Sequence, residues 1–152
     1  TQYISMRNLY VLTNYLTQIE NRYNMPTTDP DTGVGGYIRV ILGEQGYIAA
    51  SASQEYQQAA AIAYEFYIAS MNTRVDAVIN RAYVDAAEEG IMTLGLMYGN
   101  EVHKASYELY KNLGKQDSLD TTAGYAGAIG ASRWENLLPG LTTDSFYHYV
   151  SD

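Results

Sequence analysis

A long series of apolar side chains at alternating spacings of three and four residues constrains the fold more than any other feature of the sequence. Its members are Ala61, Tyr64, Ile68, Met71, Val75, Val78 and Ala82. This spacing places the side chains along one stripe of an α-helix and is typical of a seam between packed helices. Because Ser51 and Gln54 stand in capping-box register, we expect the helix to begin near residue 54. The pattern runs on, with Gly90 and Gly95 as expected breaks, so residues 54–98 form either one helix or two.

A second helical pattern occupies residues 2–24, and its polar face is mildly basic and rich in amides. One face of this pattern carries Leu9, Leu12, Leu16, Ile19 and Tyr23. The opposite face carries Arg7, Asn14, Gln18, Asn21 and Arg22. We therefore expect an amphipathic helix that buries its apolar face and keeps the arginines and amides on the other side.

The segment between these two patterns reads as a loop followed by a short strand. Residues 25–36 are rich in Pro and Gly, and residues 37–42 are β-prone. The Gly43-Glu-Gln-Gly46 sequence is typical of a turn. The segment therefore predicts either a small β-hairpin or a bent arm without a sheet.

These patterns together predict a mainly α fold, a helical bundle with an N-terminal helical arm and the small β-hairpin as an optional addition. We expect a further helix at residues 101–113, close packing at the glycines near residues 124–130, and an aromatic C-terminal tail. Residues 1–36 are predicted to form the arm and a Pro/Gly elbow, and residues 37–152 a single helical body.

Composition and motif spacing argue against several kinds of chemistry. The chain has no cysteine, which excludes thiol catalysis, disulfides and cysteine-ligated metal centres. The only histidines, His103 and His148, stand 45 residues apart and outside any Glu-x-x-His motif. The glycines from Gly33 to Gly36 lack the Gly-Lys-Ser/Thr ending of a phosphate-binding loop. We therefore expect no cofactor, no metal and no enzymatic activity, and the short apolar runs predict no membrane span.

Arginines and tyrosines are the residues that indicate a function. The net charge is −8, from 17 acidic and 9 basic residues, so any contact with a polyanion has to be local. Arg74 and Arg81 lie seven residues apart and share one face of the predicted helix, while Arg7 and Arg22 share the amide-rich face of the first helix. Arginine forks and amides bind phosphate oxygens without reading base sequence. The sixteen tyrosines, several near the termini or in loops, are typical of contacts between copies of a chain.

A polar N-terminal helix, a Pro/Gly elbow, a heptad-bearing body and an aromatic tail resemble the helical coat proteins (major capsid proteins) of rod-shaped and filamentous archaeal viruses. The resemblance implies a virion component that self-assembles into a helical filament around double-stranded DNA, with copies of itself and a second homologous coat protein as partners. The positions that it places against DNA are Arg7, Asn14, Gln18, Asn21, Arg22, Arg74 and Arg81. Since the net charge is −8, such a coat has to turn its basic side chains inward, toward the DNA, and its acidic side chains outward.

Two other functional classes remain open from the sequence. The first is a structural protein without nucleic acid, such as a phage neck or tail component or an extracellular filament. The second is a small helical enzyme or ligand-binding bundle, which requires a pocket with convergent polar groups.

Overall fold

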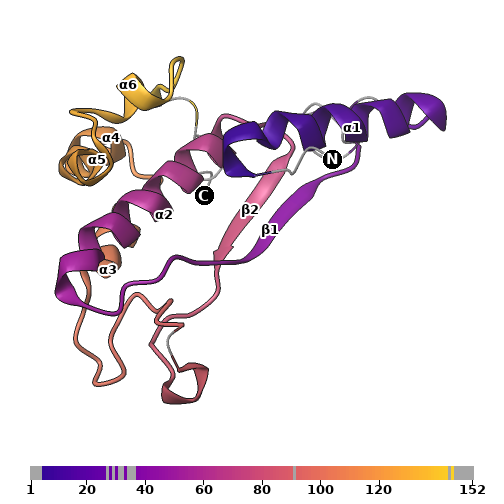
Figure 1. Cartoon of the computed structure of the whole chain (residues 1–152). Coiled ribbons are helices and arrows are strands. Elements are labelled where there is room, and N and C mark those ends of the chain that lie inside the picture. The colour runs from indigo at the N-terminus through magenta and orange to yellow at the C-terminus, as the bar shows by residue number, and fades with distance from the viewer. Residues whose placement is uncertain are drawn as a thin grey trace.

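The computed structural model describes residues 5–26, 28, 30, 33, 37–90, 92–143 and 145, in which a two-stranded sheet lies to one side of the helices (Figure 1). The longer elements are α1 (Leu9–Arg22), β1 (Val40–Gln45), α2 (Glu55–Ser70), β2 (Val75–Asn80) and α3 (Ala105–Tyr110). The shorter helices are α4 (Ser118–Thr121), α5 (Ala123–Ala126) and α6 (Trp134–Leu137). The 3-10 turns are η1 (Met6–Asn8), η2 (Ala52–Gln54), η3 (Ala87–Glu89) and η4 (Gly127–Ile129).

The two strands pair in parallel, with Val40 opposite Val75 and Gln45 opposite Asn80. Parallel strands need a crossover connection between them, and α2 supplies it. The described chain is therefore a mixed α/β domain, and the prediction of a mainly α helical bundle is wrong. The expected hairpin is wrong as well, because β1 pairs with β2, the strand that follows α2 in the sequence, and not with the residues directly after β1.

Strand β2 occupies residues for which the apolar spacing predicts a helix. The helix α2 ends at Ser70, and the chain turns before β2 begins at Val75. Within β2, Val75, Val78 and Ile79 are β-branched, and such side chains favour a strand because their χ1 freedom is restricted in a helix. The three- and four-residue spacing thus continues past the end of the helix by coincidence, and residues 54–98 form neither one helix nor two.

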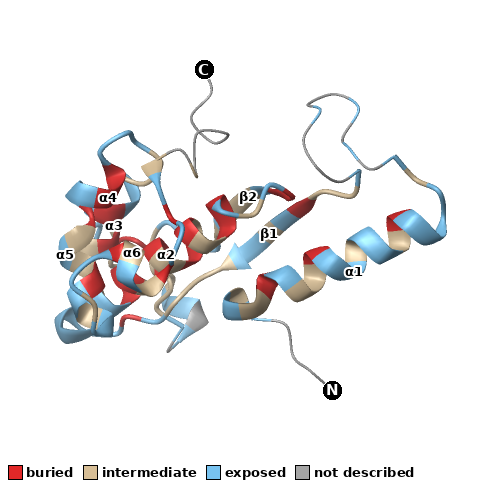
Figure 2. Cartoon of the chain, turned by 90° about the horizontal axis from the view of Figure 1, so that it is seen from above, coloured by how far each residue is buried: buried red, intermediate tan, exposed pale blue. Residues whose placement is uncertain are grey.

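The helix α2 is the central element, because it contacts α3, α5, β2 and the turns η1, η2 and η4. Figure 2 shows that buried residues concentrate along α2 and the helices beside it, whereas α1 is mostly exposed. Tyr67, Leu109 and Trp134 are fully buried in the apolar cluster around α2. The Tyr67 hydroxyl lies 2.8 Å from Ser118 Oγ and 2.7 Å from Thr122 Oγ1. Since Trp134 Nε1 also donates to Thr122 Oγ1, at 2.9 Å, the polar atoms of both large aromatics are satisfied.

A second, smaller cluster joins α1 to the sheet and to the end of α2. Its buried members are Leu9, Val40, Ala69 and Val75. By contrast, Ile41 of β1 and Ile79 of β2 are 63% and 51% exposed. Both strands therefore keep apolar side chains that the other described residues cover only in part.

Residues 81–104 form an irregular segment that returns alongside the end of β2. Val84 pairs with Met97 in a parallel bridge, and Met97 pairs with His103 in an antiparallel one. Gly95 lies so close to the neighbouring backbone that a Cβ atom there would come 2.5 Å from the amide nitrogen of Asp85. Any side chain at this position would therefore force the segment apart.

The remaining helix predictions are met in part. The N-terminal helix is confirmed over Leu9–Arg22, and the helix expected at residues 101–113 is shorter, Ala105–Tyr110. Most of the Pro/Gly elbow at residues 25–36 and of the aromatic tail, including His148, lies outside the described residues. The division at residue 36 stays a prediction.

Among the described residues, none of the helices combines the length and apolar character needed to cross a lipid bilayer.

Candidate functional site at the carboxyl ends of the strands

The carboxyl ends of β1 and β2 meet at one edge of the sheet, which is the edge where parallel α/β folds bind their ligands. Glu44 and Gln45 end β1, and Arg81 directly follows β2. The backbone N–H of Arg81 donates to the carbonyl oxygen of Gln45 at 2.7 Å, which holds the strand ends together past the last pair of the ladder. The side chains at this edge are therefore the first candidates for a binding site.

Glu44 has a backbone conformation that is uncommon for a glutamate. Its φ angle is +56°, in the left-handed region, which costs a non-glycine residue roughly 1–2 kcal/mol. Backbone conformations of this kind cluster at binding and catalytic sites. The Glu44 side chain is 84% exposed, and its Oε2 lies 3.9 Å from Nη1 of Arg81. The strand ends thus present a carboxylate and a guanidinium side by side.

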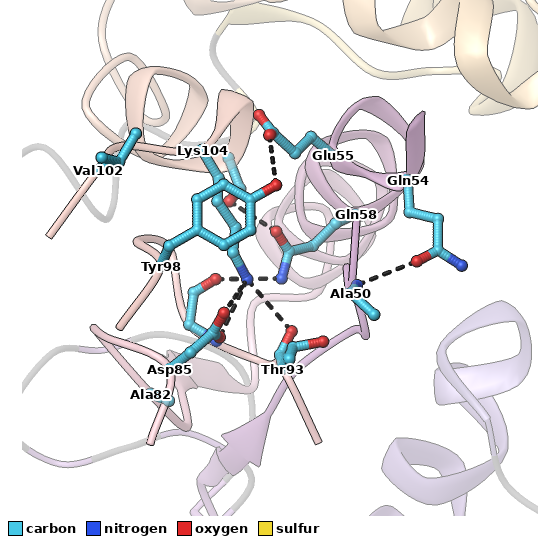
Figure 3. Close-up of polar contacts among 12 residues, drawn as sticks. Ala50, Gln54, Glu55, Gln58, Ala82, Asp85, Thr93, Tyr98, Val102 and Lys104 are labelled. Atoms are coloured by element: carbon cyan, nitrogen blue, oxygen red, sulfur yellow. Dashed lines mark hydrogen bonds and ion pairs between the residues drawn. The ribbon is translucent and has the colours of Figure 1, made fainter. Parts of the chain in front are cut away.

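A buried ion pair holds the segment that follows β2 (Figure 3). The ammonium of Lys104, whose side chain is inaccessible to solvent, lies 2.8 and 3.0 Å from the two carboxylate oxygens of Asp85. Asp85 also accepts a hydrogen bond from the Gly95 backbone N–H at 2.8 Å, and Lys104 donates to the carbonyl oxygen of Thr93 at 3.4 Å. These contacts tie three stretches of residues 81–104 to one another just beyond the strand end.

Polar side chains of α2 connect the same segment to the helix (Figure 3). Gln58 is buried, and its Nε2 donates to the carbonyl oxygens of Tyr47, at 2.7 Å, and of Gly95, at 3.2 Å. Glu55 accepts a hydrogen bond from the Tyr98 hydroxyl at 2.6 Å. This bond raises the pKa of Tyr98 to about 12, because the phenol is needed as a donor to the carboxylate. The loops around the strand ends are therefore anchored on a rigid helix.

The comparisons with known proteins identify a family for this chain. The family model of DUF5722, described as a family of unknown function, matches residues 1–137. The chain belongs to the DUF5722 family. The residues of the chain that match the DUF5722 model include every element from α1 through α6, and so include Glu44, Arg81 and the Lys104–Asp85 pair. No curated protein and no solved structure matches the chain.

The structure separates the two arginines that the sequence places on one helix face. Arg74 lies just before β2 and Arg81 just after it, because a strand and not a helix connects them. Arg74 is buried, and its two terminal nitrogens each lie 2.6 Å from a carboxylate oxygen of Glu20. The guanidinium and the backbone N–H of Ile38, which donates at 2.7 Å, lower the pKa of Glu20 to about 2. Arg74 therefore joins α1 to the amino end of the sheet.

The predicted nucleic-acid residues of the first helix are all exposed on or next to α1. These residues are Arg7, Asn14, Gln18, Asn21 and Arg22. Gln18 and Arg22 line one surface hollow of about 300 Å³ together with Tyr15, Ile19 and Tyr23. Arg7 lines a different hollow, so the structure brings together Gln18 and Arg22 but not the whole set.

No sequence motif marks the residues of the strand-end site. Glu44 falls in a Gly-Glu-Gln-Gly sequence that is typical of a turn, and Asp85 and Lys104 stand 19 residues apart, a spacing that no motif predicts. The β-branched residues Val75, Val78 and Ile79 are the available signal, since a strand there places Arg81 at its end. Within the described residues, no three His, Cys, Asp or Glu side chains are placed to hold a metal ion.

Proposed function

We propose that the carboxyl ends of β1 and β2 bind a neutral ligand that carries several hydroxyl groups, the chemical class that includes sugars. The observation that carries this proposal is Glu44 itself. It is a glutamate with a left-handed backbone at the end of a parallel strand, and its exposed carboxylate lies 3.9 Å from the guanidinium of Arg81.

The chemistry of the pair favours hydroxyl groups over charged ligands. A hydroxyl donates one hydrogen bond, which a carboxylate accepts, and its lone pairs accept hydrogen bonds, which a guanidinium donates. Because Glu44 and Arg81 balance each other's charge, the pair attracts neither a phosphate nor an ammonium group strongly.

The proposal concerns binding and not catalysis. A carboxylate at a strand end has the right chemistry for acid–base or nucleophilic catalysis, but these mechanisms need a second positioned group. Asp85, the next carboxylate along the chain after Arg81, is held by Lys104. The expectation that the chain is not an enzyme therefore stays a prediction.

The test is saturation-transfer NMR of the chain with a panel of neutral mono- and oligosaccharides. We expect signal transfer to at least one sugar, and its loss in Glu44→Gln and in Arg81→Gln, because each variant removes half of the donor–acceptor pair. Arg133→Gln is the matched control, since Arg133 is a half-exposed arginine that pairs with Asp120 and Glu135 at the start of α6. Transfer that persists in both site variants, or its absence for every sugar with the folded wild type, would overturn the proposal.

A second candidate function is self-assembly as a coat protein around double-stranded DNA in a virion. The observation that favours it is the hollow on α1, where Gln18 and Arg22 lie with Tyr15 and Tyr23, which are 58% and 69% exposed. Amides, arginine and exposed aromatics suit both phosphate contacts and contacts between copies. A second homologous coat protein belongs to the same proposal.

Size-exclusion chromatography of nuclease-treated material tests this second candidate when the 260/280 nm absorbance ratio is read across each peak. We expect a high-mass peak with a nucleic-acid ratio, which Arg22→Glu abolishes and Arg133→Glu keeps. A high-mass peak with a pure-protein ratio would instead support a filament or phage tail component without nucleic acid. A lone peak near the mass of one chain, 16.9 kDa, would contradict self-assembly.

A further inference from the structure

A pocket of about 230 Å³ lies between α2, α3 and β2. Its lining does not include Glu44 or Arg81, although it reaches Gln45 and Asn80, the last residues of the two strands. Most of its wall is apolar, from Ile62 and Phe66 of α2, Val78 of β2, and Leu113 just beyond α3. Pockets of this kind, apolar with a few polar groups, are where small ligands bind. The polar group that sets the chemistry here is Glu65 of α2.

The Glu65 carboxyl is buried and incompletely satisfied. The residue is 2% exposed, and its Oε1 has no hydrogen-bond partner among the described residues. The Tyr47 hydroxyl binds the same carboxyl group. A buried carboxylate oxygen without a partner loses its hydration and gains nothing in return, so an unmet acceptor is normally matched by a ligand or water.

The charged and titratable groups around Glu65 leave its charge uncompensated. From β2, Asp76 faces the pocket, but Arg39 binds its carboxylate at 2.6 Å. Tyr110 of α3 lines the pocket, and Tyr47, which follows β1, makes a hydrogen bond with the Glu65 carboxyl group. Burial raises the pKa of Glu65 to about 7, and the hydrogen bond from the Tyr47 hydroxyl, which lowers it, offsets this rise only in part.

We infer that this pocket binds a small organic cation, an alkylammonium whose nitrogen donates to Glu65 Oε1 and whose hydrocarbon part lies against the apolar wall. The rings of Phe66 and Tyr110 also line the pocket, and aromatic faces attract ammonium groups. An inorganic cation fits less well, because it needs several oxygen ligands and the wall is mostly apolar.

The test compares n-butylammonium with 1-butanol, its neutral counterpart of similar shape, by isothermal titration calorimetry. We expect a Kd on the order of 1 mM for the ammonium, given the small size of the probe, and much weaker binding of the alcohol. Affinity should rise about tenfold from about pH 6 to about pH 8, because Glu65 has to be ionised to bind a cation. Near pH 6, binding should release about one proton, which two buffers of different ionisation enthalpy reveal.

Glu65→Gln keeps the shape and the hydrogen bond to Tyr47 but removes the negative charge. We expect it to weaken butylammonium binding by about 10- to 100-fold and to abolish the pH dependence. Glu88→Gln, at an exposed glutamate of η3, is the matched control and should leave binding unchanged. Equal affinity for butanol and butylammonium, an unaffected Glu65→Gln variant, or no heat of binding with the folded wild type up to about 20 mM probe would each overturn the inference. Glu44→Gln should bind the ammonium normally, which separates this test from that of the strand-end site.

Discussion

Two arginines flank strand β2 and have opposite environments. Arg74, before the strand, is buried and binds both carboxylate oxygens of Glu20 at 2.6 Å. Arg81, after the strand, is partly exposed, and Nη1 lies 3.9 Å from the mostly exposed carboxylate of Glu44. The first pair has the close two-point geometry of a structural ion pair, whereas the second is long and open to solvent.

The difference shows that the sheet is covered at its amino end and exposed at its carboxyl end. At the amino end, α1 closes over the strands through Arg74, Glu20 and the backbone of Ile38. At the carboxyl end, the Lys104–Asp85 pair supports the loops, but Glu44 stays exposed in a strained conformation. The exposed carboxyl end of the sheet is therefore where we propose the binding site.

The largest effect is expected from breaking the buried pair. Arg74→Ala should lower the free energy of unfolding by about 3–5 kcal/mol, because it leaves the Glu20 carboxylate buried without its cation. Arg81→Ala, the same change at the other end of β2, should cost about 0–1 kcal/mol because its pair is exposed. Urea denaturation measures both, and similar losses for the two variants would contradict the division between structural and functional ends.

The next largest loss of stability is expected from breaking the Lys104–Asp85 ion pair, which supports the loops at the carboxyl end of the sheet. Lys104→Met should lower the free energy of unfolding by about 3 kcal/mol, since it leaves Asp85 buried without its cation. The loss should fall at the lower end of the range for buried pairs, because Asp85 keeps the Gly95 N–H and some contact with solvent. Lys111→Met, at an exposed lysine that pairs with Glu108, is the control and should be nearly neutral. A neutral Lys104→Met would mean that the buried pair does not hold the loops.

Acid should weaken the closed end specifically. The pKa of Glu20 is about 2 in the folded chain and about 4.5 when unfolded, so its contribution to stability is complete above about pH 4.5. That contribution should be lost as the pH falls from about 4.5 to about 2, because the unfolded chain takes up the proton first. Glu20→Gln should flatten this part of the stability curve measured by urea denaturation, and Glu44→Gln should leave it unchanged. A slope that survives in Glu20→Gln would assign the acid sensitivity to other carboxyl groups.

The last effect is small and stabilising, and it is expected at Glu44. Glu44→Gly should raise the free energy of unfolding by about 1 kcal/mol, because glycine adopts a positive φ without steric cost. Glu101→Gly is a matched control, since Glu101 is also exposed and has a φ of +64°. Both variants should be stabilised in thermal unfolding, and only Glu44→Gly should lose sugar binding. Loss of binding in both would indicate a general loosening of the loops.

The sequence predicted the helices better than the sheet, for physical reasons. The N-terminal helix is correct because its apolar residues recur with the helical period and face a neighbouring cluster through Leu9, Leu12 and Leu16. Strand β2 was predicted as helix because Val75 and Val78 happen to continue the spacing of α2. Parallel pairing joins residues about 35 positions apart, such as Val40 and Val75, so no local pattern could reveal it.

The incorrect placing of Arg74 and Arg81 in one nucleic-acid site followed from the same error. With residues 74–81 read as a helix, Arg74 and Arg81 fall on one face, whereas a strand places them at opposite ends of the sheet. Glu44 gave no signal, because a left-handed backbone at a non-glycine residue is set by the surrounding structure and not by the residue itself.

Backbone amide NMR of the chain, recorded as a neutral oligosaccharide is added, tests the central claim most directly. We expect the largest shift changes to cluster at residues 43–46 and 80–83, at the carboxyl ends of β1 and β2, and no response from Arg74 or from the residues of α1 around Glu20. Changes centred on α1, or no changes at either end of the sheet with any sugar of the panel, would contradict it.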